Sequence, residues 1–193
     1  MKYNKTVILR DGRPCLLRNA DENDTAKVLE IFDLTHAQTD FLLTYPDEKT
    51  FTFEEEEEFL RRSAESDRDV EIIAVVDGGV VGSAGFYPIG KREKIKHRAE
   101  LGISVDMNYW GLGIGRSLLD ACIECAEQAG FEQLELQVIG ENERAVRLYE
   151  REGFKEFGRN PKGFKTRDGK YQDLVDMRLE IGKNDGRERP RRS

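Results

Sequence analysis

Three glycines at alternate positions, Gly111, Gly113 and Gly115, stand between a segment of alternating apolar residues and a long amphipathic one. Glycine has no Cβ, so this backbone can adopt dihedral angles that other residues avoid, and ligand oxygens can approach its N–H groups closely. The first N–H groups of a helix after such a turn have no partner within the helix and lie at the positive end of its dipole. We therefore expect an anion, such as the pyrophosphate of a nucleotide-like cofactor, to bind the run Tyr109-Trp110-Gly111-Leu112-Gly113-Ile114-Gly115-Arg116.

The segments on both sides of this turn form a strand–turn–helix unit. Residues 99–105 alternate apolar side chains with Glu100, Gly102 and Ser104, which predicts a strand with two chemically different faces. Beyond the turn, apolar residues recur at steps of three and four until Gly130, which predicts a helix. A strand over 133–138 and a short helix from Asn142 to Glu152 continue the alternation.

Short apolar and β-branched runs predict two hairpins and two closing strands. An Asp-Gly dipeptide, which tolerates the positive dihedral angles of tight turns, joins the two strands of each hairpin. The expected strands cover residues 7–10, 15–18, 70–76, 80–87, 154–159 and 171–181. Together with the strand–turn–helix unit, this order predicts an α/β fold with a mixed, mostly antiparallel central sheet flanked by helices.

Two more helices are expected between the hairpins. Asn23 or Asp24 would cap the first, which runs to about Leu34. The second covers residues 53–64 and opens with five consecutive glutamates, and acidic residues suit the first turn of a helix because of its dipole. We expect these glutamates to form a solvated face rather than a metal site or a docking surface.

The length and the charge of the chain limit its organisation and its partners. Its 193 residues suit a single domain over 1–182, followed by a basic tail at 183–193 that we expect to be disordered. The formal net charge is −7 and the basic run lies in that tail, so we expect no nucleic-acid partner. The sequence contains neither a run of roughly 20 apolar residues nor a secretory signal, which predicts no membrane partner and a cytoplasmic location.

Neither the cysteines nor the glycines support a metal or an NAD site. Cys122 and Cys125 have the spacing of half a zinc site, but a second pair is missing and both fall on the apolar side of the predicted helix. We therefore expect them to pack in the core, and we expect no metal. A dinucleotide site needs Gly-x-Gly-x-x-Gly, whereas Arg116 occupies the last glycine position here.

Residues 101–154 resemble the cofactor-binding half of the GNAT superfamily of acetyl-CoA-dependent N-acetyltransferases. Gly113 and Gly115 fill the glycine positions of its motif Arg/Gln-x-x-Gly-x-Gly/Ala, while Trp110 stands where the arginine or glutamine is usual. Downstream, Asn142-x-x-Ala145-x-x-Leu148-Tyr149 followed by Gly153-Phe154 resembles the second signature of the superfamily. A looser similarity runs from about residue 15 to 181, and the closing stretch 163–177 is similar to the branches that acetylate amino acids and amines.

The resemblance implies acetyl-CoA as the co-substrate and a small-molecule primary amine, an amino acid or a polyamine-like cation, as the acceptor. Direct attack in a ternary complex is the implied route. It also implies that backbone groups of Ile103, Ser104 and Val105 pair with the pantetheine arm and polarise the acetyl carbonyl. The remaining expected cofactor contacts are Gly111, Gly113, Ile114, Gly115, Arg116 and Asn142. For Arg116 a helix-surface position and for Asn142 a helix cap are the alternatives.

Acetyl transfer from a thioester to an amine requires a proton acceptor for the amine and a proton donor for the departing thiolate. Tyr149 is the candidate acid, because a phenol stays protonated at neutral pH. An aromatic core residue is the alternative for this position. Glu100 is the candidate base, directly or through water, and a solvent-facing strand glutamate is the alternative. His97 has a suitable pKa but lies in a cationic loop, so it is the weaker candidate.

Several functions therefore remain open. The alternatives to a small-molecule N-acetyltransferase are a protein or peptide N-terminal acetyltransferase, a non-catalytic acyl-CoA-binding protein and a nucleotide-dependent oxidoreductase. We expect the acceptor to be selected by residues 35–53 and 88–98, which carry no chemical signature of their own. Pairing of strands near residues 154–181 would give a homodimer.

Overall fold

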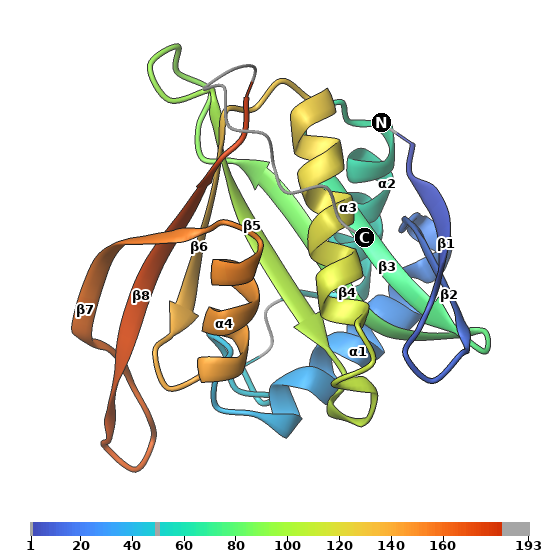
Figure 1. Ribbon diagram of the computed structural model, residues 1–193. Helices are drawn as coiled ribbons and strands as arrows, with labels where there is room; N and C mark the ends of the chain where they lie inside the picture. The colour runs from blue at the N-terminus through green and yellow to red at the C-terminus, as the bar shows by residue number, and fades with distance from the viewer. Residues whose placement is uncertain (1, 49–50, 183–193) are drawn as a thin grey trace.

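The computed structural model describes residues 2–48 and 51–182, and these build one eight-stranded sheet in the order β1-β2-β3-β4-β5-β6-β8-β7 (Figure 1). Neighbouring strands are antiparallel except β5 and β6, which are parallel. The predicted mixed, mostly antiparallel sheet is confirmed. The strands are β1 (Asn4–Ile8), β2 (Pro14–Asn19), β3 (Val70–Val76), β4 (Gly79–Pro88), β5 (Arg98–Val105), β6 (Gln133–Ile139), β7 (Lys155–Lys165) and β8 (Tyr171–Glu180).

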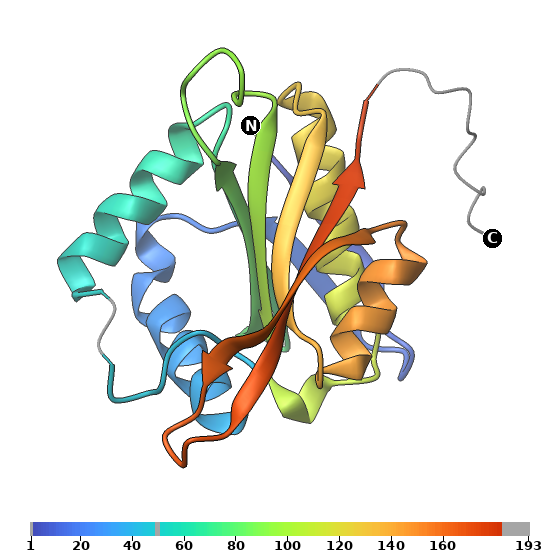
Figure 2. The same cartoon turned by 90° about the vertical axis from the view of Figure 1, so that its left-hand side faces the viewer.

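Helices cover both faces of the sheet. Figure 2 shows α1 (Thr25–Gln38) and α2 (Phe53–Glu65) on one face, and α3 (Ile114–Gln128) and α4 (Glu143–Arg151) on the other. Successive residues of β3 enter different cores, because side chains alternate along a strand. Ile72 packs in the cluster that contains Leu118 of α3, and Ile73 packs in the cluster that contains Leu60 of α2.

The helix α1 begins after Asp24, which is its N-cap as predicted, although the Asp24 side chain makes no capping hydrogen bond to α1. Asp21 caps the short 3-10 helix that precedes α1: its carboxylate accepts a hydrogen bond from the Asn23 N–H at 2.9 Å. In return the Asp24 carboxylate accepts one from the Asp21 N–H at 3.1 Å, which completes a capping box around the short 3-10 helix η1 (Glu22–Asp24). The Asp24 carboxylate also forms an ion pair of 2.6 Å with Arg18, and this contact connects the start of α1 to β2.

Two other expectations about helices hold only in part. α1 ends at Gln38 rather than near Leu34, because the last turn contains no residue that breaks a helix. Four of the five glutamates are exposed, as expected, but Glu56 is only 6 % exposed, and burial raises the pKa of its carboxyl group. Five consecutive residues span more than one helical turn, so one of them must face the sheet on the side of Leu60.

The parallel strands β5 and β6 separate soon after they meet. They pair only over Arg98–Glu100 and Gln133–Glu135, although β5 continues to Val105 and β6 to Ile139 (Figure 1). In the described part of the chain, the groups of β5 that face β6 beyond Glu100 have no ladder partner, and such backbone groups require one. Apart from the Val105 carbonyl, which accepts a hydrogen bond from the Trp110 side chain, the separation therefore leaves main-chain donors and acceptors available to a ligand.

Two further predictions concern a membrane-spanning helix and the C-terminal segment. No helix within residues 2–48 and 51–182 combines the length and the apolar composition needed to cross a bilayer. The basic segment 183–193 lies outside the described residues, so its disorder and the domain boundary at 182 stay predictions.

Candidate active site

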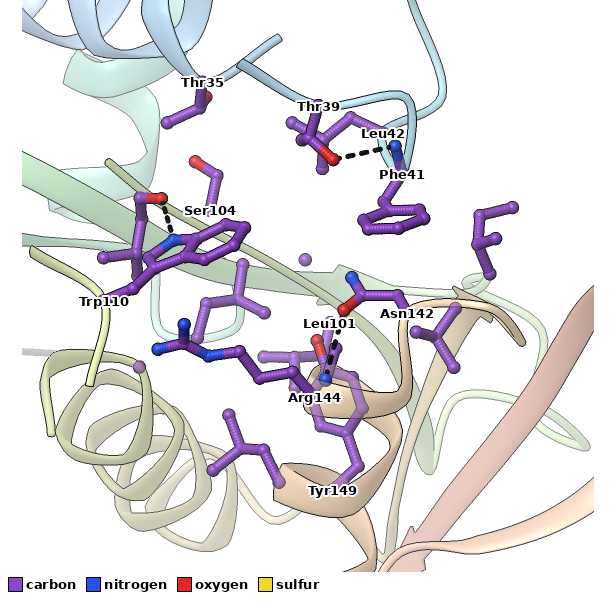
Figure 3. Close-up of a pocket in the computed structure, with 18 of the residues that line it drawn as sticks. Thr35, Thr39, Phe41, Leu42, Leu101, Ser104, Trp110, Asn142, Arg144 and Tyr149 are labelled. Carbon is purple, nitrogen blue, oxygen red and sulfur yellow. Dashed lines mark hydrogen bonds between the residues drawn. The ribbon is translucent and has the colours of Figure 1, made fainter. Parts of the chain in front are cut away.

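A cavity of about 660 Å³ opens where β5 and β6 separate (Figure 3). Residues 101–105 of β5, the glycine turn and the start of α3 form one part of its lining, and α4 forms another. Thr35 of α1 and the segment after α1, with Thr39, Phe41 and Leu42, lie across the cavity from Tyr149. Every site residue predicted from the sequence lines this cavity: Tyr149, Glu100, Ile103, Ser104, Val105, Gly111, Gly113, Ile114, Gly115, Arg116 and Asn142.

The glycine turn has the backbone that an anion site requires. Gly111 and Gly113 have φ of +83° and +100°, the left-handed region in which other residues are strained. Gly113 is the N-cap of α3 and provides no capping side chain, so the first N–H groups of the helix are left for a ligand. An added Cβ at Gly113 would meet no atom within 4 Å, so the dihedral angle rather than crowding requires glycine there.

Trp110 and Arg144 form a stacked pair beside this turn. The indole Nε1 of Trp110 donates a hydrogen bond to the Val105 carbonyl at 2.7 Å, which fixes the ring against the end of β5. The Arg144 guanidinium lies 4.5 Å from the centre of this ring, within the range of a cation–π interaction. Desolvation lowers the pKa of Arg144 from its usual value. In Figure 3 both side chains lie on the cavity wall near the start of α3.

α4 contributes Tyr149 and Asn142 to the cavity. Tyr149 is 6 % exposed, and its ring lies 5.7 Å from that of Phe154. Burial, and next the nearby Cys122, raise the pKa of the Tyr149 phenol well above its usual value, so it stays protonated at all moderate pH values. The Asn142 side chain accepts a hydrogen bond from the Ala145 N–H at 3.2 Å, which confirms it as the helix cap, and it also lines the cavity.

Glu100 lies near the start of β5, away from the glycine turn, at the last position where β5 still pairs with β6. It is directly opposite Tyr87 of β4, so both side chains are on the same face of the sheet. Burial, then the charge of Glu100 and a hydrogen bond to it, raise the pKa of the Tyr87 phenol. Among the described residues His97 does not line the cavity, and its carbonyl accepts hydrogen bonds from the backbone of Glu132 and Gln133. The geometry favours Glu100 over His97 as a base.

The side of the cavity away from the glycine turn has an apolar lining from three separate segments. Phe41 and Leu42 follow α1, Phe164 belongs to β7 and Leu174 to β8. Gln137 of β6 adds a polar group. The part of the cavity that the glycine turn and α3 do not line, called the acceptor end below, therefore combines apolar walls with the carboxylate of Glu100 and neutral polar side chains.

Comparison with known protein families shows which family contains this combination of strand, glycine turn and helix. The profile of the Acetyltransferase (GNAT) family matches residues 32–154, which include the diverging strand, the glycine turn and α4. The chain belongs to this family.

Relatives of this GNAT-family protein match more than half of its length. The acetyltransferase of the GNAT family from Streptococcus pneumoniae superposes with a TM-score of 0.83 at 31 % identity, and the match covers 86 % of this chain and 99 % of that one. YwnH of Bacillus subtilis (strain 168), assigned provisionally as a phosphinothricin acetyltransferase, is 29 % identical over 165 residues, which are 86 % of this chain and 98 % of YwnH. The L-amino acid N-acetyltransferase AaaT of Escherichia coli (strain K12) is 31 % identical over 108 residues, 55 % of this chain and 65 % of AaaT.

Family membership confirms the enzyme class and the donor. The GNAT-family protein is an acyltransferase, specifically an N-acetyltransferase, and acetyl-CoA is the donor that this family uses. The predicted GNAT-like fold is confirmed by the same comparisons. The roles of individual residues, Tyr149 and Glu100 among them, stay predictions.

Two arginines of this GNAT-family cavity were missed by the sequence analysis. Arg10 donates a hydrogen bond from Nη1 to the Gly111 carbonyl at 3.1 Å, and its N–H donates to the Leu112 carbonyl at 3.1 Å. The sequence has no signal for this contact, because about a hundred residues separate the partners. Arg144 did leave a signal: it lies in the first turn of a predicted helix, where the helix dipole disfavours a cation.

Arg116, the arginine that the sequence did predict for this site, has a protein partner. Its Nε lies 3.0 Å from Oε1 of Glu152, and the two side chains are 52 % and 3 % exposed. This ion pair joins the first turn of α3 to the residue after α4. Arg116 therefore connects the two helices that line the GNAT-family cavity, and a phosphate contact by the rest of its guanidinium stays a prediction.

Proposed function

We propose that this protein transfers the acetyl group of acetyl-CoA to the primary amine of a small molecule, by direct attack in a ternary complex. The observation that supports this most is the position of Tyr149 in one cavity with the glycine turn and the unpaired part of β5. A binding protein would need the turn and the strand, but not a buried phenol beside them.

The cofactor end would be bound mainly by backbone groups. The first N–H groups of α3 and the left-handed glycines are suited to the diphosphate, and Arg144 with Arg10 adds positive charge. The unpaired groups of β5 after Glu100 are suited to the amides of a pantetheine arm. Acetyl-CoA would supply an activated acetyl thioester at the end of this path.

One side chain would donate a proton during the transfer and another would accept one. Tyr149 keeps its proton because burial raises the pKa of its phenol, so it can donate to a departing thiolate. Glu100, at the other end of the cavity, would accept the proton of the amine directly or through water. Backbone N–H groups of residues 103–105 would stabilise the oxyanion of the attacked carbonyl.

The class of acceptor is supported by the cavity and by the relatives. The acceptor end offers apolar walls and one carboxylate, which suits a small amine, and AaaT is named for L-amino acids. Phosphinothricin, the substrate in the provisional name of YwnH, is the second candidate. A cytoplasmic location is part of the same proposal.

The test is acetyl-CoA binding by titration calorimetry, followed by release of free thiol with a panel of amines. The panel should contain L-amino acids, phosphinothricin, a polyamine and a peptide with a free N-terminus. We expect binding of acetyl-CoA but not of NADH, and thiol release above the hydrolysis background with a small amine. Binding without thiol release for any amine would favour a non-catalytic acyl-CoA-binding protein, and release with the peptide alone would favour N-terminal acetylation.

A further inference from the structure

The segment after α1 crosses the acceptor side of the cavity as a strap, defined here as residues 39–48. Thr39, Phe41, Leu42 and Leu43 of the strap line the cavity, and Figure 3 shows Thr39, Phe41 and Leu42 across from Tyr149. The strap has no helix or strand of its own. Its position must therefore be fixed by contacts with other parts of the molecule.

The start of the strap is tied to the cofactor side. Gln38, the last residue of α1, donates a hydrogen bond from Nε2 to the Asp106 carboxylate at 2.8 Å. Its Oε1 accepts a hydrogen bond from the Met107 N–H at 2.9 Å. Asp106 is 7 % exposed and follows β5 directly, so this end of the strap is held against the chain that leads to the glycine turn.

The far end of the strap is tied to the β7–β8 hairpin by one residue, Arg167. Its N–H donates a hydrogen bond to the Tyr45 hydroxyl at 3.0 Å, and its Nη2 donates to the Asp47 carboxylate at 2.6 Å. Its guanidinium also lies 4.1 Å from the centre of the Tyr45 ring. Three contacts of different kinds thus converge on a residue about 120 positions away in the sequence.

The strap presents the two partners of Arg167 together. The Tyr45 N–H donates to the Glu48 carboxylate at 2.8 Å, and the Glu48 N–H donates to the Tyr45 carbonyl at 3.0 Å. These bonds close a turn that contains both Tyr45 and Asp47. The turn at the end of the strap is therefore held by its own hydrogen bonds as well as by Arg167, which lowers the entropic cost of the contact with Arg167.

The hairpin that carries Arg167 also lines the cavity. Phe164 of β7 and Leu174 of β8 belong to the lining, and Arg167 is in the turn between these strands. Arg167 thus joins two walls of the acceptor end, the strap and the hairpin. Its own side chain does not line the cavity among the described residues, so any effect on the acceptor is indirect.

We propose that Arg167 is a positioning residue for the acceptor amine: it holds the strap against the β7–β8 hairpin and so sets the width of the acceptor end of the cavity. This inference rests on the proposed function, since it assumes that an amine binds there. Loss of the contact would leave the cofactor end unchanged, because Gln38 ties the strap to that side independently.

The kinetic test compares Arg167→Ala with Arg61→Ala. Arg61 is a matched control, because it is 54 % exposed against 56 % for Arg167 and also pairs with a carboxylate, Glu58, but on α2. For Arg167→Ala we expect the acceptor KM to rise about fivefold or more, as the loss of an exposed ion pair and a cation–π contact implies, with the acetyl-CoA KM unchanged. Arg167→Lys, which keeps the charge, should recover part of the loss. Equal changes in both KM values, or none, would overturn the proposal.

A second measurement needs no substrate and separates this proposal from the proposed function. Hydrogen exchange of the strap amides, residues 40–48, should become severalfold faster in Arg167→Ala and stay unchanged in Arg61→Ala. Tyr45→Phe, which keeps the ring and removes the hydroxyl acceptor, should give a smaller acceleration. Unchanged exchange in Arg167→Ala would overturn the role of Arg167 even if the enzyme acetylates amines. Faster exchange in a protein that acetylates no amine would instead refute the proposed function alone.

Discussion

The two ends of the cavity are built by different means. At the cofactor end, consecutive residues provide the site: the end of β5, the glycine turn and the start of α3 follow one another within residues 101–116. At the acceptor end, side chains from α1, the strap, β7 and β8 meet across more than a hundred residues. Main-chain groups dominate the first end and side-chain contacts the second.

This difference indicates which parts of the site can vary without loss of the fold. Backbone groups recognise what every acyl-CoA shares, and they need only glycine dihedral angles and a strand without a partner. Side-chain contacts on loops can change without disturbing the sheet, so they are suited to selecting the acceptor. Substitutions at the cofactor end should therefore impair reactions with all amines, and substitutions at the acceptor end should discriminate among amines.

The largest effect should come from Tyr149→Phe, which tests whether the cofactor end also contains the acid. We expect kcat to fall about 100-fold or more, because a positioned general acid contributes on that scale, while the acetyl-CoA Kd stays unchanged. The loss should be similar for every amine. Tyr171→Phe is the control, since Tyr171 is an exposed phenol on β8. A loss confined to some amines would move Tyr149 to the acceptor end.

The second prediction concerns stability and the face of the sheet under α1 and α2. Glu71 of β3 lies over Gly85 on that face, and burial raises the pKa of its carboxyl from 4.5 to about 7. A hydrogen bond from Ser83 acts in the opposite direction, and Glu56 adds to the rise. The folded protein therefore binds a proton that the unfolded chain has released between these pH values, so stability falls as the pH rises through this window.

Urea unfolding of Glu71→Gln tests this directly. Glutamine keeps the shape but does not titrate, so the variant should gain up to about 3 kcal/mol over the wild type between pH 5 and pH 8. Glu57→Gln, an exposed glutamate on α2, should follow the wild type. Parallel pH profiles for Glu71→Gln and the wild type would contradict the prediction.

The third prediction tests the backbone character of the cofactor end. Gly113→Val places a β-branched residue at φ +100°, which costs about 1–3 kcal/mol and disturbs the N-cap of α3. We expect the acetyl-CoA Kd to rise at least about tenfold. Gly12→Val is the matched control, because Gly12 has φ +87° and equally open space but belongs to the β1–β2 turn. Equal acetyl-CoA affinity in the two variants would show that the turn does not bind the donor.

The same contrast explains how much the sequence could predict. The cofactor end was predicted because its signals are local: alternation in residues 99–105, glycines before a helix, and Asn142 before the next one. These patterns follow from periods of two and 3.6 residues and from capping, which need no tertiary information. All eleven residues of the predicted site line one cavity for this reason.

The acceptor end left no such signal. The contact of Arg167 with Tyr45 and Asp47 depends on how a hairpin and a loop meet after folding, and neither segment has a periodic pattern. The burial of Glu56 was missed for a related reason: a run of glutamates predicts an exposed helix face, and only the packing of α2 on the sheet buries one of them. Both features depend on tertiary packing, which neither composition nor a local sequence pattern determines.

The smallest expected effect belongs to Glu100→Gln, the carboxylate of the acceptor end. At pH 7 an amine with a pKa near 10.4 is almost fully protonated, whereas one with a pKa near 8 is neutral in about a tenth of the molecules. A base should therefore matter more for the first, and we expect kcat/KM to fall about tenfold for a lysine-type amine and only about twofold for an N-terminal amine. Glu141→Gln, an exposed glutamate before α4, is the control. Equal losses for both amines would mean that Glu100 attracts the charged ammonium rather than accepting its proton, which would make it a binding residue for the acceptor and not the base.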